Sequence, residues 1–81
     1  MERKSVPQDN SLSVDARLEI FGAKIRTFRR ARGLTQQELA ENSALDRKTI
    51  SRIENHQYSP SLSTIFSIAE ALEVEPKDLM P

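Results

Sequence analysis

The sequence contains no cysteine and no tryptophan, and only two of its 81 residues are glycine. The absence of cysteine excludes disulfides and thiolate metal sites, and it fits a cytoplasmic protein. No apolar run approaches the roughly 18 to 20 residues that span a bilayer. Residues 1–14 are polar and lack the apolar core of a secretory signal. We therefore expect one cytoplasmic domain with a single core and no contact with a membrane.

The chain also lacks net charge, because twelve basic residues balance twelve acidic ones. A nucleic-acid-binding domain is usually basic, so this total argues mildly against DNA as a partner. The charge is unevenly distributed, however: residues 1–33 carry +4, residues 34–54 carry −1 and residues 55–81 carry −3. Salt screens charges beyond roughly 8 Å, so a local patch matters more than the total. The neutral total therefore excludes little.

Groups for catalysis are scarce. The chain has one histidine and no catalytic signature such as GxSxG, a phosphate loop or HExxH. Glu70 and Glu73 lie one turn apart, but no third oxygen ligand for a cation is near them in the sequence. His56 reads as a surface loop histidine. We expect no enzymatic activity, no metal, no cofactor and no small-molecule ligand.

The pattern of apolar residues predicts an all-α domain. Residues 1–13 show no periodicity and are interpreted as a flexible N-terminal arm, followed by a domain over residues 14–81. From Val14, apolar residues recur every three or four positions, which predicts a first helix that ends at Gly33. Gly22 lies inside this helix at a cost of about 1 kcal/mol, which indicates close packing there.

Two closely spaced capping signals follow. Thr35 and Glu38 form a capping box that starts a helix over about residues 36–42. Asp46 is the N-cap of a third helix that runs to about Asn55. Two capped helices joined by a short turn predict a helix-turn-helix.

The C-terminal third predicts two more helices. Ser61 caps a fourth helix, whose apolar stripe is wide enough that it is either central or shared with a partner. Pro76 suits the first turn of a short fifth helix, although Glu75 is a poor N-cap. The expected architecture is thus a compact bundle of five helices.

The third helix has a basic face. Ile50 and Ile53 point inward, and the opposite face carries Arg47, Lys48, Ser51, Arg52 and Asn55. Arginine reads guanine through two parallel hydrogen bonds and asparagine reads adenine, while serine and lysine serve bases or phosphates. An ordinary solvated face is the alternative, and the capped helix and tight turn before it favour DNA.

The run GLTQQELAENSALDRKTISRIEN, followed by SPSLSTIFSIAEALEV and PKDLM, resembles the Cro and phage-repressor (XRE-type) helix-turn-helix family over residues 20–80. The resemblance implies that the second helix crosses the DNA backbone while the third enters the major groove. It also implies an ion pair between Arg29 and Glu54. Ala44 and His56 depart from the family, which often has glycine at both positions.

The candidate site residues fall into three groups. Base reading is expected of Arg47, Lys48, Ser51 and Arg52. Phosphate contacts are expected of Gln36, Gln37, Thr49, Asn55, Gln57 and Tyr58, although Tyr58 could instead pack on the core. A homodimer interface is expected of Phe66, Ile68, Val74, Leu79 and Met80, although these residues could instead close the monomer's own core.

The sequence therefore predicts a transcriptional regulator that binds double-stranded DNA as a homodimer on a near-palindromic operator. The compact form favours a controller protein of a restriction–modification system. A phage or plasmid repressor of Cro type fits the sequence nearly as well. The alternative from another class is an antitoxin or adaptor module that holds a protein partner with its apolar C-terminal face.

Overall fold

The computed structural model describes residues 12–81, which are all-α with one 3-10 turn. The elements are α1 (Val14–Ala31), α2 (Gln36–Asn42), α3 (Arg47–Glu54), α4 (Leu62–Leu72) and the 3-10 turn η1 (Pro76–Leu79). The predicted arm lies outside the described residues except for Leu12 and Ser13. Ser13 is the N-cap of α1, because its side chain accepts a hydrogen bond from the Ala16 amide at 3.0 Å.

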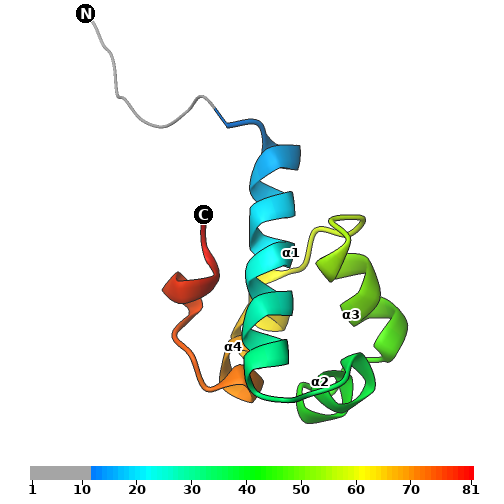
Figure 1. The fold of residues 1–81 in the computed structure, drawn as a ribbon. Helices are drawn as coiled ribbons and strands as arrows, with labels where there is room; N and C mark the ends of the chain where they lie inside the picture. The colour runs from blue at the N-terminus through cyan, green and yellow to red at the C-terminus, as the bar shows by residue number, and fades with distance from the viewer. Residues whose placement is uncertain (1–11) are drawn as a thin grey trace, which may run out of the picture.

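Helix α1 is the axis of the domain (Figure 1). Helix α3 packs against both α1 and α2, α4 packs against α2, and η1 packs against α1 and α4. In Figure 1, α2 and α3 lie on one side of α1 and η1 lies on the other. The helix-turn-helix therefore occupies one side of the domain, with α1 and α4 behind it.

The core draws on every element. Its buried apolar residues are Phe21, Ile25, Leu39, Ala40, Ile50, Ile53, Ile68, Ala69, Leu72 and Leu79. Gly22 belongs to the same buried region, and a Cβ atom there would collide with the backbone carbonyl of Ile53 and press on that of Glu54. Glycine at this position thus lets α1 approach the end of α3 closely.

Each α-helix is followed within two residues by one in the left-handed conformation. These residues are Gly33 (φ 70°), Ala44 (φ 59°), His56 (φ 47°) and Glu73 (φ 61°). After α2, the Leu45 amide donates back to the Ala40 carbonyl at 2.8 Å, which is the long bond of a Schellman motif. Three of the four positions are not glycine, and a left-handed residue with a Cβ costs roughly 1 to 2 kcal/mol. Ala44 and His56 therefore keep the turn geometry despite departing from the family pattern.

The expected fifth helix is a single 3-10 turn, so this part of the prediction is wrong. The Asp78 carboxylate accepts a hydrogen bond from the Glu75 amide at 3.0 Å, and Pro76 occupies the first position. The turn stops at Met80 because the following residue is Pro81, which disfavours helical backbone before it. Met80 is accordingly extended (φ −81°, ψ 151°).

Two residues assigned to the dimer interface instead fill the core. Ile68 and Leu79 are both 0% exposed, so neither has surface left to contact a partner. Val74 is half-buried against the core, whereas Phe66 and Met80 are exposed. The wide apolar stripe of α4 is thus divided between the domain's own core and its surface.

Candidate nucleic-acid interface

Helix α3 presents a basic face to solvent. The Asp46 side chain caps the helix by accepting a hydrogen bond from the Thr49 amide at 2.8 Å. Ile50 and Ile53 are buried against the domain, which turns Arg47, Lys48 and Arg52 outward, all three exposed. Within residues 12–81, none of these three cations forms a hydrogen bond or ion pair with a protein group.

The pKa of Asp46, the N-cap residue of α3, is lowered by its surroundings. Hydrogen bonds from Thr49, with the nearby charges of Lys48 and Arg52, hold the pKa of Asp46 below its ordinary value. The carboxylate therefore stays ionised as a cap near neutral pH, and Lys48 and Arg52 remain exposed to solvent.

Helix α2 begins beside α3 and carries the predicted phosphate contacts Gln36 and Gln37. Its capping box is complete: the Glu38 amide donates to the Thr35 hydroxyl at 3.0 Å, and the Thr35 amide donates to the Glu38 carboxylate at 2.9 Å. Gln37 is exposed and donates to Glu41 on the next turn at 3.0 Å. Gln36 turns inward and donates to the Glu54 carboxylate at 3.1 Å.

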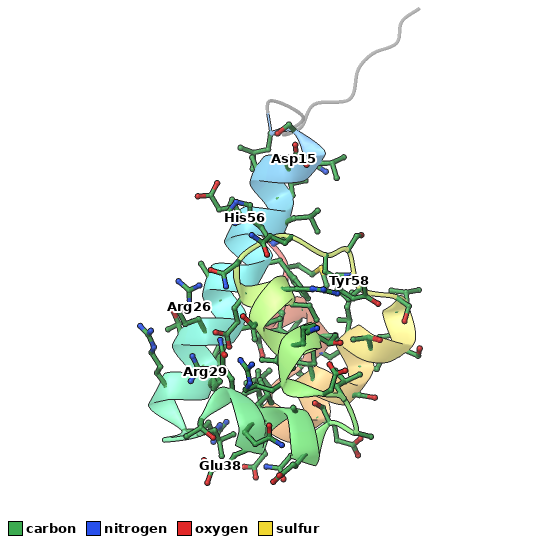
Figure 2. All side chains as sticks on the ribbon, turned by 90° about the vertical axis from the view of Figure 1, so that its right-hand side faces the viewer. Asp15, Arg26, Arg29, Glu38, His56 and Tyr58 are labelled. Atoms are coloured by element: carbon green, nitrogen blue, oxygen red, sulfur yellow. The ribbon has the colours of Figure 1, made fainter. Side chains whose placement is uncertain are left out.

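The remaining predicted contacts are divided between α3 and the loop after it. Thr49 and Ser51 are partly exposed on α3, and Gln57 is exposed in the loop. Tyr58 is 43% exposed, so its ring does not sit in the core (Figure 2). Asn55 caps the end of α3 instead, since its side-chain nitrogen donates to the Ser51 carbonyl at 2.8 Å.

A buried ion pair joins this surface to α1. The Arg29 guanidinium donates to both carboxylate oxygens of Glu54, at 2.5 and 3.0 Å, and to the Leu34 carbonyl at 2.8 Å. Burial alone raises the pKa of Glu54, but the hydrogen bonds from Arg29 and Gln36 and the charges of Arg29 and Arg26 outweigh it. The net effect lowers the pKa, so Glu54 is a carboxylate at neutral pH.

Comparison with known proteins decides the family. The model of the helix-turn-helix family HTH_3 matches residues 25–79, which include α2, α3 and the turn between them. The chain belongs to this family. It is a helix-turn-helix DNA-binding transcriptional regulator and not an enzyme.

Individual relatives are phage repressors and controller proteins. The chain is 43% identical to the immunity repressor of Bacillus phage phi105 over 67% of its own length, but it spans only 38% of that repressor. It is 40% identical to the control protein C.BamHI of Bacillus amyloliquefaciens, covering 75% of this chain and 76% of that protein. The crystal structure of the restriction–modification controller protein C.AhdI from Aeromonas hydrophila superimposes with a TM-score of 0.77 at 41% identity, covering 78% of this chain and 96% of that one.

Sequence reasoning missed one arginine that contacts the helix-turn-helix from α1. Arg26 of α1 donates from Nη2 to the Glu54 carbonyl at 3.0 Å and to Asn55 Oδ1 at 3.3 Å. In the sequence it reads as one of several solvated basic residues of the first helix. The spacing of Gly22, Arg26 and Arg29, at i, i+4 and i+7, was the available signal, since it places all three on one stripe of α1.

Other kinds of site find little support in the part of the chain described. No group of three or more histidine or carboxylate side chains there could hold a metal ion. None of the helices in residues 12–81 is long and apolar enough to cross a membrane.

Proposed function

We propose that this regulator binds a near-palindromic operator as a homodimer, in the manner of a restriction–modification controller protein. The observation that carries the proposal is the outer face of α3, where Arg47, Lys48 and Arg52 are exposed and form no hydrogen bond or ion pair with a protein group of residues 12–81. The similarity to C.BamHI and C.AhdI supports the controller type over a phage repressor, because the chain covers most of both controller proteins.

The proposed base contacts and phosphate contacts follow from side-chain chemistry. Arg47, Lys48, Ser51 and Arg52 discriminate bases in the major groove, because their donors lie on the free face of the helix. Gln37, Thr49, Gln57 and Tyr58 contact phosphates along its edges, which fixes the register without reading sequence. The Gln36 and Asn55 side chains both donate to residues of α3, namely Glu54 and Ser51, so we assign them to holding α3 in place.

A second copy of the chain is the proposed partner on the far side of the domain. Leu62 is 67% exposed and Phe66 is 55% exposed on α4. Ile65 of the same helix lines an apolar groove of about 300 Å³, together with Val14, Leu18 and Met80. Exposed apolar side chains next to an apolar groove are typical of a protein interface. In a two-fold dimer each copy offers both features to the other.

Two copies would place their α3 helices in successive major grooves, about 34 Å apart. The acidic C-terminal third, which DNA would repel, belongs to the half of the domain that faces the second copy. An antitoxin or adaptor module could use the same apolar face for a different protein, and its capture at one-to-one stoichiometry in place of a second copy would favour that function.

The decisive experiment is selection of bound sequences from random double-stranded DNA, followed by a salt series on the selected site. Enrichment of two half-sites one helical turn apart is expected, with affinity that falls steeply as salt rises. Replacing Arg52 with Ala should cost about 1 to 3 kcal/mol on the selected site and much less on scrambled DNA. Selection without enrichment, or binding indifferent to salt, would remove the proposal.

A further inference from the structure

The C-terminal end of α3 rests on a single stripe of α1. Gly22 lies against the backbone carbonyls of Ile53 and Glu54, and the next turn of α1 brings Arg26 to the same place. One turn further, Arg29 holds the Glu54 side chain. Figure 2 shows Arg26 and Arg29 along α1 beside α3. The C-terminal end of α3 is therefore held against α1 through both its backbone and its side chains.

At the end of α3, Arg29 contacts only the Glu54 side chain, whereas Arg26 contacts the backbone as well as two side chains. Its Nη2 atom donates to the Glu54 carbonyl and to Asn55 Oδ1, and its Nε lies 3.6 Å from the Glu54 carboxylate. Asn55 in turn donates to the Ser51 carbonyl, one turn back in the helix. The last carbonyls of a helix have no partner within it and carry partial negative charge, so a cation that donates to them stabilises that end.

We propose that Arg26 and Asn55 act together as a positioning latch for α3 and thereby determine how well the regulator discriminates its operator. This inference rests on the proposed function, because it concerns the same reading face. Helix α3 has eight residues, so it is about 12 Å long. Its first turn is held by the connection to α2, and the latch holds its other end. Both ends must be fixed for an arginine to meet two acceptors on one base.

A direct phosphate contact by Arg26 is the competing role. The Arg26 side chain is only 35% exposed, and its guanidinium already donates to one carbonyl and one side-chain amide oxygen. A residue that contacts phosphate weakens binding to every sequence alike and reduces the salt dependence. A residue that positions the reading helix weakens binding to the operator alone, so the two roles give different measurements.

The test uses the full 81-residue chain and the operator obtained by selection. Dissociation constants are measured on the operator and on scrambled DNA over a salt series, at a temperature at which each variant is folded by circular dichroism. The variants are Arg26→Ala, Arg26→Lys and, as a matched control, Arg30→Ala. Arg30 is an exposed arginine of the same helix whose side chain makes no hydrogen bond or ion pair with residues 12–81.

Arg26→Ala is expected to lose about tenfold in affinity for the operator, comparable to one base contact, with binding to scrambled DNA and the salt slope unchanged. Arg26→Lys should lose a similar amount, because lysine keeps the charge but not the planar guanidinium whose Nη2 donates to both acceptors while its Nε lies near the Glu54 carboxylate. Arg30→Ala should retain the wild-type ratio. If Arg26→Ala does not fold, Asn55→Ala removes one acceptor of the latch and should show the same selective loss.

An equal loss on both DNAs with a shallower salt slope would overturn the latch and make Arg26 a phosphate contact. An unchanged ratio of the two affinities would overturn it as well. These results differ from a failure of the proposed function, in which the wild-type chain itself selects no sequence.

Discussion

The Arg29 guanidinium meets the Glu54 carboxylate through two hydrogen bonds, and both side chains are almost wholly shielded from solvent, at 10% and 0% exposure. Removing one partner of such a pair leaves a buried charge without compensation, which costs about 3 to 5 kcal/mol. The pair joins α1 to the last residue of α3. Its loss therefore weakens the attachment of α3 to α1 as well as the packing of the core.

We expect Arg29→Ala to lower the free energy of unfolding by about 3 to 5 kcal/mol in urea denaturation, because it strands the Glu54 carboxylate. The double variant Arg29→Met/Glu54→Leu should be less destabilised than Arg29→Ala, since it removes both charges and keeps the volume. Arg30→Ala is the control and should stay within about 0.5 kcal/mol of wild type. A double variant that is less stable than Arg29→Ala would contradict this account.

Stability should fall as the solution is acidified. The folded chain lowers the pKa of Glu54 below its ordinary value of 4.5, so the unfolded state binds the proton more readily. The stabilisation is fully present above about pH 4.5 and is lost as pH falls through the lower folded pKa. Urea denaturation between pH 7 and pH 3 should show this decline.

Asp46→Asn isolates the contribution of the second carboxylate with a lowered pKa, that of Asp46, to the loss of stability in acid. Asparagine caps a helix about as well as aspartate, so stability at pH 7 should change little. The variant can no longer titrate at this position. Its free energy of unfolding should therefore fall less on acidification than that of wild type. Identical pH profiles for the two chains would show that Asp46 contributes nothing to acid sensitivity.

Ala44→Gly should stabilise the domain. Ala44 has a φ of 59°, where its Cβ costs roughly 1 to 2 kcal/mol, and glycine removes that cost. We expect a net gain of about 1 kcal/mol, which for a domain of this size raises the melting temperature by roughly 4 to 8 °C. Ala44→Val is the opposite control and should melt lower. A lower melting temperature for Ala44→Gly would disprove the strain at this turn.

Gly22→Ala should destabilise the domain although alanine favours helices by about 1 kcal/mol. Its Cβ would collide with the Ile53 carbonyl, and such overpacking costs typically 1 to 3 kcal/mol. The matched control is Ala23→Gly at the adjacent exposed position, where the loss of about 1 kcal/mol reflects helix propensity alone. If Gly22→Ala raises the melting temperature, the close approach of α1 to α3 is wrong.

Phe66 and Ile68 should respond differently to truncation. Phe66 is exposed, so Phe66→Ser should leave the fold intact and shift the proposed dimer towards monomer in sedimentation measurements. Ile68 is fully buried, so Ile68→Ala should cost about 2 to 5 kcal/mol of stability. A Phe66→Ser chain that stays fully dimeric would remove Phe66 from the interface.

The elements of this fold could be predicted where local chemistry determines them. Helices α2 and α4 start after the residues expected to cap them, because Thr35 and Ser61 each satisfy an amide of their own first turn. The left-handed residue after α1 is the predicted Gly33. These features depend on neighbours within a few positions, so the sequence contains them directly.

The sequence could not distinguish residues of similar type within one helix, because their roles depend on tertiary packing. Ile68 and Phe66 lie two residues apart in one apolar stripe, and only the placement of α4 decides that the first is core and the second is surface. Arg26 and Arg30 are both basic residues of the first helix, and only the approach of α3 distinguishes them. The 3-10 form of η1 depends on how Leu79 is buried as well as on Pro81.

Helices α2 and α3 have only seven and eight residues, below the roughly 12 to 15 that an isolated helix needs to be even marginally stable in water. Neither helix can persist apart from the contacts with α1 and α4. The proposed DNA recognition by α3 therefore depends on the entire domain, and we expect a peptide containing only residues 46–55 to be a coil.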